Sequence, residues 1–292
     1  MTIRKVGVLG SGQMGSGIAQ VAAVAGFEVV ARDLEESQLS RGRKAVESSL
    51  AKFVEKAKLA PQDRDAALGR LRFTTRIEDL GDSDLVIEAV TENLELKNGQ
   101  WRALDTVCPA ETLFASNTSS LSIMAMAAVT GRPDRFLGLH FFNPVPMMPL
   151  VEVVRSIATS PATIAAGTDF VRRLGKEPVA ARDSAGFIVN RLLIPYLLDA
   201  ARAVEQGVAS IQDVDNGMKL GCGHPMGPLT LLDFIGLDTA VAVGEILFDE
   251  FREPRYAPPP LLRRMVLAGW LGRKSGRGFY DWTTTPPTPV TL

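Results

Sequence analysis

The stretch Arg4-Lys5-Val6-Gly7-Val8-Leu9-Gly10-Ser11-Gly12-Gln13-Met14-Gly15 decides the fold. Its apolar first half predicts a buried strand, and the pattern Gly-x-Gly-x-x-Gly follows directly, with helical periodicity up to about Ala25. A second apolar run, residues 27–32, comes next and ends at Asp33. The glycine pattern alone is a weak signal in a chain with 26 glycines, but this context is specific. We therefore expect an α/β fold with a Rossmann-type, mostly parallel sheet.

Each glycine of this loop has a physical reason to be there. Gly10 permits the tight turn, Gly12 lets a pyrophosphate approach the backbone, and Gly15 allows the helix to pack closely on the strand. The amino terminus of the helix then stabilises the phosphates of a dinucleotide. Gln13 and Met14 belong to the same segment. All five are candidate cofactor-binding residues.

The acidic residue after the second strand bears on the choice of cofactor. Asp33 is placed to accept hydrogen bonds from the adenosine ribose and to repel a 2′-phosphate, which favours NAD. Arg32 beside it could instead accommodate that phosphate, so NADP is not excluded.

Length and composition predict a globular chain with two domains. It has 292 residues, 46% of them hydrophobic, and a formal net charge of -1, so we expect no general attraction for nucleic acid. A strand-like run begins by Ile3, and no 18-residue uncharged apolar stretch occurs, so we expect neither a targeting peptide nor a membrane span. Cys108 and Cys222 lie far apart, which predicts reduced thiols and no metal site. The expected compartment is the cytoplasm.

A strand and helix rhythm continues after the first unit. The expected strands are residues 71–74, 84–90, 112–116, 135–140, 149–155 and 177–181. Open α/β sheets place their ligands at the carboxyl ends of such strands, which makes Glu92, Lys97, Asn117 and Ser119 candidates. The plainer interpretations are helix-surface charges for Glu92 and Lys97 and a helix cap for Ser119.

One histidine lies at the end of an apolar strand. His140 is one of two histidines, and Glu152 shares a strand face with the apolar Leu150 and Val154. A carboxylate left unpaired there would be costly, so His140 is its expected partner. Imidazole titrates near neutral pH and a carboxylate fixes its tautomer, so the pair is a candidate general base with its orienting group. The alternative is an ordinary core histidine.

From residue 186 onward the periodicity is helical. We expect a Rossmann-like NAD-binding domain over 1–185 and a helical substrate and dimerisation domain over 186–292. The expected helices are about 187–206, from 213, 229–251 and 260–269, and the tail after Trp282 is expected to be unstructured. Asn190 would face the strand ends if its helix packs over them, and is otherwise a surface residue. An apolar helical domain this small often completes its core across a dimer interface.

The chain resembles the L-3-hydroxyacyl-CoA dehydrogenase family, and within it the bacterial 3-hydroxybutyryl-CoA dehydrogenases, over nearly its whole length. The matching stretches are Gly10–Gln20, Glu88–Leu94, Ser116–Leu121, His140–Pro146, Leu150–Val154, Gly186–Arg191, Pro225–Pro228 and Gly276–Tyr280. The resemblance implies reversible oxidation of (S)-3-hydroxyacyl-CoA to 3-ketoacyl-CoA with NAD. Sugar-acid oxidation of the L-gulonate type and a non-catalytic, crystallin-like NAD-binding role are the competing interpretations.

The resemblance also implies roles for single residues. It makes His140 the catalytic base and Glu152 its partner, with Ser119 and Asn190 at the substrate. The residues that it implies at NAD are Asp33, Glu92, Lys97, Ser119, Asn143 and Lys274. It places Ser49 and Lys56 near the CoA moiety, on a weaker match.

Overall fold

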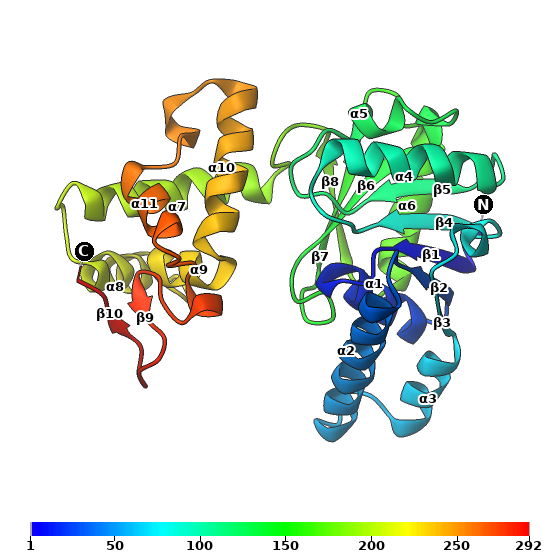
Figure 1. Ribbon diagram of the computed structural model, residues 1–292, viewed down its shortest axis with the longest axis horizontal. Helices are drawn as coiled ribbons and strands as arrows, with labels where there is room; N and C mark the ends of the chain where they lie inside the picture. The colour runs from blue at the N-terminus through cyan, green and yellow to red at the C-terminus, as the bar shows by residue number, and fades with distance from the viewer. Residues whose placement is uncertain (1, 292) are drawn as a thin grey trace. The chain divides into compact units, whose positions relative to one another are not determined.

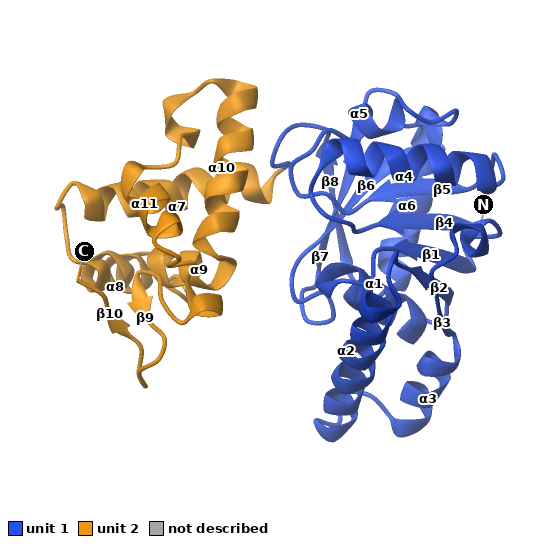
Figure 2. Cartoon of the chain, viewed as in Figure 1, with its two compact units in different colours: residues 1–187 blue, residues 188–292 orange. Residues whose placement is uncertain are grey.

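The computed structural model describes residues 2–291 and divides the chain into two compact units. The first unit extends to Phe187 and the second begins at Ile188 (Figure 2). Each unit has its own architecture.

An eight-stranded sheet forms the centre of the first unit, in the order β3-β2-β1-β4-β5-β6-β7-β8 (Figure 1). The strands are β1 (Lys5–Leu9), β2 (Glu28–Arg32), β3 (Leu71–Thr74), β4 (Leu85–Glu88), β5 (Leu113–Ser116), β6 (Phe136–Phe141), β7 (Leu150–Arg155) and β8 (Glu177–Arg182). Neighbouring strands run parallel except β6 and β7, which are antiparallel. The predicted mostly parallel, Rossmann-type sheet is confirmed.

Helices cover both faces of this sheet, which explains why its strands read as continuous apolar runs. They are α1 (Gln13–Val24), α2 (Glu36–Glu55), α3 (Pro61–Gly69), α4 (Leu94–Val107), α5 (Ile123–Ala127) and α6 (Pro161–Arg173), with short 3-10 turns η1 (Ile77–Leu80) and η2 (Pro133–Arg135). One apolar layer joins Val8, Ile18 of α1 and Phe170 of α6. The other joins Trp101 of α4 with Phe114 and the remaining strand face. Because both faces of the sheet are buried, polar side chains can reach a ligand only at the ends of the strands.

The strand directions bring several loops to one edge of the sheet. β1, β2, β4, β5 and β6 all end at this edge, and β7 begins there because it is antiparallel to β6. The connections that follow β1, β2, β4 and β5 begin at Gly10, Asp33, Ala89 and Asn117. This is the edge at which α/β sheets bind ligands.

The second unit is mainly helical, as predicted, with two differences from the expected elements. It contains α7 (Val189–Glu205), α8 (Ile211–Cys222), α9 (Pro228–Ile235), α10 (Leu237–Phe251), the 3-10 turn η3 (Pro254–Tyr256), α11 (Pro260–Leu267) and η4 (Arg273–Ser275). The single helix expected over 229–251 is wrong, because Gly236 adopts a φ of 99° and separates α9 from α10. The unstructured tail is also wrong, because β10 (Thr288–Pro289) pairs with β9 (Tyr280–Asp281).

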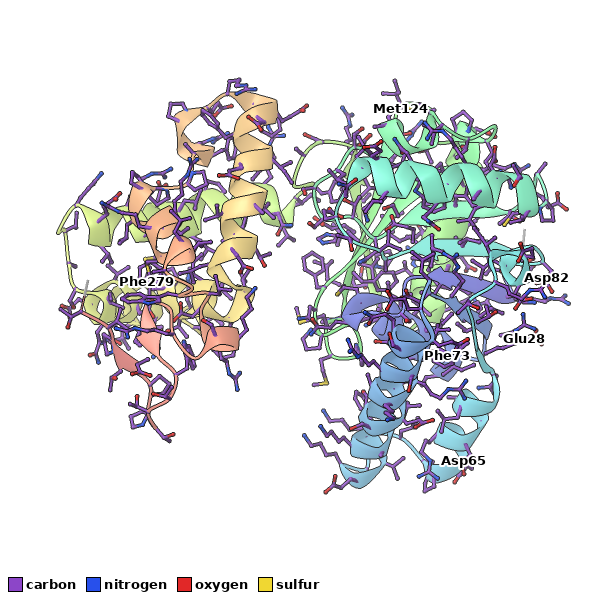
Figure 3. All side chains as sticks on the ribbon, in the orientation of Figure 1. Glu28, Asp65, Phe73, Asp82, Met124 and Phe279 are labelled. Atoms are coloured by element: carbon purple, nitrogen blue, oxygen red, sulfur yellow. The ribbon has the colours of Figure 1, made fainter. Side chains whose placement is uncertain are left out.

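Two buried aspartates hold this carboxyl-terminal hairpin in place. Asp233 accepts hydrogen bonds from the backbone N–H of Phe279 and of Tyr280, both at 2.9 Å, and from Nε1 of Trp282 at 2.8 Å. Asp215 accepts from the Tyr280 hydroxyl at 2.9 Å. Phe279 is fully buried in the interior of the unit (Figure 3). Burial raises the pKa of Asp233, against the effect of its hydrogen bonds.

Within residues 2–291, the helices are all too short or too polar to cross a membrane.

Candidate active site

The glycine loop after β1 has the geometry that its sequence predicts. A Cβ on Gly15 would lie 1.9 Å from the carbonyl oxygen of Gly10, so the helix can pack here only on glycine. Gly10 has a φ of +100°, which disfavours any side chain. Gly12, the N-cap of α1, differs, because a Cβ there would have no neighbour within 4 Å in the described chain. The loop thus leaves open space at the positive end of a helix, where a phosphate fits.

Asp33 lies beside this loop in a fixed orientation. Its Oδ2 accepts hydrogen bonds from the Ser11 backbone N–H at 2.7 Å and hydroxyl at 2.9 Å, and its Oδ1 accepts from the Leu34 N–H at 2.8 Å. The carboxylate lines a cavity of about 300 Å³ together with Gly10 and Gly12. A bare glycine loop next to a fixed carboxylate fits the phosphates and adenosine ribose of a dinucleotide.

The neighbouring arginine has protein partners of its own. Arg32 donates from Nε to the Thr75 carbonyl at 3.2 Å and from Nη1 to Oε1 of Gln100 at 3.0 Å. Both Arg32 and Gln100 line the same cavity as Asp33. The guanidinium of Arg32 therefore lies at the wall of the cavity and is hydrogen-bonded to Thr75 and Gln100.

His140 and Glu152 are in direct contact, as the alternation of β7 predicts. They are directly opposite each other in the antiparallel pair β6–β7, with Nδ1 of His140 2.6 Å from Oε2 of Glu152. Exposure of the histidine is 6% and of the glutamate 0%. A carboxylate only accepts, so Nδ1 carries the proton and Nε2 presents its lone pair in the neutral ring. The pair can accept a proton at Nε2 while Glu152 balances the charge.

Aromatic rings and an asparagine fix the surroundings of His140. Phe142 and Phe187 lie with ring centroids 4.5 Å and 5.7 Å from the imidazole. Asn117 accepts a hydrogen bond from the Phe141 N–H at 2.9 Å through its side-chain oxygen. Its own N–H donates to the Glu88 carbonyl at 2.8 Å. Asn117 therefore ties the end of β6 to the ends of the neighbouring strands.

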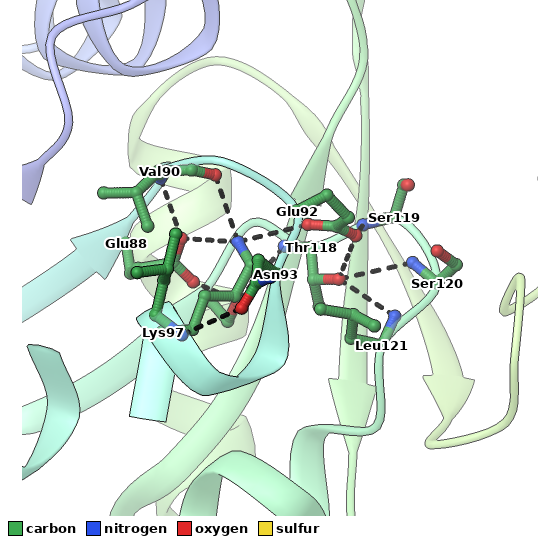
Figure 4. Close-up of polar contacts among 11 residues, drawn as sticks. Glu88, Val90, Glu92, Asn93, Lys97, Thr118, Ser119, Ser120 and Leu121 are labelled. Carbon is green, nitrogen blue, oxygen red and sulfur yellow. Dashed lines mark hydrogen bonds and ion pairs between the residues drawn. The ribbon is translucent and has the colours of Figure 1, made fainter. Parts of the chain in front are cut away.

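A charged cluster lies between the ends of β4 and β5 (Figure 4). Lys97 is 1% exposed, and its Nζ lies 2.6 Å from Oε1 of Glu88 and 3.1 Å from Oε2 of Glu92. Glu92 in turn accepts hydrogen bonds from the Thr118 hydroxyl and from the Ser119 backbone N–H, the latter at 3.0 Å. Glu92, Lys97 and Ser119 are thus joined in one network. Glu88 and Thr118 were not predicted as site residues, although a glutamate at the end of an apolar strand was a visible signal.

The remaining candidates in the first unit differ in their placement. Gln13, Ser49 and Asn143 line one cavity of about 380 Å³ between α1, α2 and the loop after β6. Met14 packs its side chain against the apolar layer that contains Ile18 of α1. Lys56 is the exposed C-cap of α2 and does not line this cavity.

Asn190 and Lys274 belong to the second unit. Asn190 lies in the first turn of α7, and Lys274 forms an ion pair with Asp238 at 2.6 Å.

Known proteins match the chain over almost its whole length. It is 51% identical over 282 residues to a 3-hydroxybutyryl-CoA dehydrogenase of Mycobacterium tuberculosis, covering 96% of this chain and 99% of the relative. It is 47% identical over 291 residues to the mitochondrial hydroxyacyl-coenzyme A dehydrogenase of Rattus norvegicus, covering 96% and 91%. The crystal structure of (S)-3-hydroxybutyryl-CoA dehydrogenase from Ralstonia eutropha superimposes with a TM-score of 0.94 at 48% identity, covering 97% and 100%.

Family models agree with these relatives in both halves. The NAD binding domain of 3-hydroxyacyl-CoA dehydrogenase matches residues 5–184, and the C-terminal domain of the same enzyme matches residues 186–282. These matches confirm the predicted resemblance, the enzyme class and NAD as its cofactor. The chain therefore belongs to the 3-hydroxyacyl-CoA dehydrogenase family.

Proposed function

We propose that this chain catalyses the reversible NAD-dependent oxidation of (S)-3-hydroxyacyl-CoA to 3-ketoacyl-CoA, with 3-hydroxybutyryl-CoA as its substrate. The observation that carries the proposal is the buried contact of 2.6 Å between His140 and Glu152, in the unit that also holds the open glycine loop. The names of the relatives from Mycobacterium tuberculosis and Ralstonia eutropha support the four-carbon acyl chain.

His140 is the general base in this proposal. Its Nε2 removes the proton from the C3 hydroxyl, and Glu152 stabilises the imidazolium that forms at Nδ1. The glycine loop and Asp33 would hold NAD, whose nicotinamide would supply the acceptor for the hydride of C3. In the reverse direction the protonated His140 returns its proton to the C3 oxygen of the ketone.

Ser119 and Asn190 are the proposed substrate-positioning residues. Both carry groups that can hydrogen-bond the C3 oxygen and the acyl carbonyl, and holding these atoms in reacting geometry is a large part of catalysis. We assign Ser49 and Lys56 to the CoA moiety. The position of Ser49 in the cavity with Gln13 and Asn143 supports its assignment more strongly than the exposed position of Lys56.

NAD is the cofactor that this chain's residues fit. The proposed cofactor residues are Gly10, Gly12, Gln13, Met14, Gly15, Asp33, Glu92, Lys97, Asn117, Ser119, Asn143 and Lys274. Asp33 offers its carboxylate to the ribose, and Arg32 is engaged by Thr75 and Gln100, which disfavours NADP.

Steady-state assays separate this proposal from sugar-acid oxidation. We expect turnover of acetoacetyl-CoA with NADH and a strong preference for NADH over NADPH. Replacing His140 by glutamine should abolish this turnover. Activity on L-gulonate alone would overturn the substrate assignment. Unchanged turnover of acetoacetyl-CoA by His140→Gln would overturn the base assignment.

We further propose two domains divided at residues 185 and 186, a homodimer formed through the helical one, and a cytoplasmic location. The helical unit exposes the large apolar side chains of Leu192, Leu220 and Leu267, at 69%, 84% and 87%, which a dimer interface would cover. Sedimentation equilibrium should give twice the mass of one chain. A monomer at all concentrations would contradict the homodimer.

A further inference from the structure

We propose that Glu88 and Lys97 form a buried positioning relay that holds Glu92, and through Glu92 the turn that carries Ser119, in the geometry required for turnover. The inference rests on the proposed function, because it gives the relay a purpose at the substrate. It assigns to Lys97 the role of holding Glu92.

The burial of Lys97 is the first step of the argument. Three acceptors lie within reach of its Nζ, namely Oε1 of Glu88 at 2.6 Å, the Val90 carbonyl at 3.2 Å and Oε2 of Glu92 at 3.1 Å. An ammonium group has three donors, so these acceptors saturate it. With 1% exposure, Lys97 is held within the protein by these three contacts.

Glu88 is the fixed end of the relay. It is fully buried, and both of its carboxylate oxygens accept hydrogen bonds. Oε1 accepts from Nζ of Lys97 and from the Val90 N–H at 2.8 Å, and Oε2 accepts from the Ser116 hydroxyl at 2.6 Å. Its backbone lies in β4 beside β5, whose last residue is Ser116. The carboxylate is therefore anchored to two strands and cannot shift without moving them.

Glu92 is the far end, where the relay reaches the site. Its side chain is 34% exposed, and the ion pair with Lys97 at 3.1 Å is the contact that ties this carboxylate to the buried end of the relay. Glu92 then receives the Thr118 hydroxyl and the Ser119 N–H, and the Thr118 oxygen also accepts from the Leu121 N–H at 3.0 Å (Figure 4). The turn from Thr118 to Leu121 thus depends on the position of Glu92.

The two carboxylates of the relay require a cation between them. Glu88, Lys97 and Glu92 sum to a single negative charge, and a buried carboxylate without its cation is strongly unfavourable. If the cluster served stability alone, its hydrogen bonds could end at Lys97. They continue instead to the backbone of Ser119, which is a proposed substrate residue.

A double-mutant cycle in the full-length protein tests the relay. We expect Glu88→Gln to lower kcat for acetoacetyl-CoA reduction about ten-fold with little change in KM, because small misplacements of reacting groups are costly. Ser119→Ala should also be slow, and the double variant should be no slower than Ser119→Ala within about two-fold, since residues acting through one path are not additive. Glu95→Gln, at an exposed glutamate of α4, is the matched control and should retain full activity.

Each outcome decides a different point. Independent effects of Glu88→Gln and Ser119→Ala, or full kcat for Glu88→Gln, would overturn the relay and leave the proposed function intact. Full kcat for Ser119→Ala would overturn the role of Ser119 and the relay together. If Glu88→Gln does not fold, Ser116→Ala removes the hydroxyl that anchors Oε2 of Glu88, and the same cycle with Ser119→Ala applies.

Discussion

Replacing Glu152 by glutamine isolates the charge that this residue supplies to His140. Glutamine has the same shape and can still accept a hydrogen bond from Nδ1, so the change removes charge rather than packing. The carboxylate is fully buried and 2.6 Å from Nδ1, which leaves solvent little opportunity to compensate for its loss. The variant should therefore fold and bind NADH normally but turn over slowly.

The size of the effect follows from this geometry. Unit charges about 4 Å apart interact by about 4 kcal/mol at an effective dielectric constant of about 20, and a hydrogen bond to a charged group contributes about 1.5 to 3 kcal/mol. His140 is neutral before the proton transfer and becomes charged during it, so about 2 to 4 kcal/mol should be lost from the transition state. At about 1.4 kcal/mol per factor of ten, kcat for 3-hydroxybutyryl-CoA oxidation should fall roughly 30-fold to 1000-fold.

The assay follows NADH formation at saturating substrate and cofactor. Glu177→Gln is the matched control, because Glu177 is an exposed glutamate at the start of the adjacent strand β8. It should retain full activity, and thermal melts of both variants should show folded protein. A folded Glu152→Gln variant with kcat close to that of the unmodified protein would refute the idea that Glu152 stabilises the imidazolium.

Three further outcomes follow from other parts of the chain. Gly12→Ala should leave the melting temperature unchanged but weaken NADH binding at least about ten-fold, because the new methyl group occupies the open loop surface; unchanged affinity would contradict the phosphate site. Gly278→Ala places a Cβ 2.0 Å from the buried carboxylate of Asp233 and should lower the free energy of unfolding by about 1 to 3 kcal/mol in denaturant titrations. Gly217→Ala on α8, where the Cβ meets no neighbour, should raise it by up to about 1 kcal/mol. Burial raises the pKa of Cys108 to about 11, so alkylation near pH 8 should label the exposed Cys222 alone until the protein is denatured, and a native adduct on Cys108 would refute this.

Local patterns in the sequence determined the α/β class, the glycine loop and the family. They did so because a strand, a tight turn and a helix are encoded within a few neighbouring residues, and because glycine is required wherever the backbone approaches itself closely, as at Gly15. The contact between His140 and Glu152 was also predictable. Alternation along β7 placed a carboxylate among apolar neighbours, and a short turn linked it to the strand of the only histidine nearby.

Tertiary structure alone decided which distant polar groups meet. Neither the relay from Glu88 through Lys97 to Glu92 nor the anchoring of the final hairpin by Asp233 has a periodic signature. Their partners come from separate elements, and only the strand order and helix packing bring them within hydrogen-bonding distance. The break at Gly236 was missed for the related reason that a glycine within a helical pattern is tolerated, and its φ of 99° is set by the surrounding packing. Sequence thus specifies the elements and the chemistry that they carry, whereas the buried charges that hold this chemistry in place are specified by the fold.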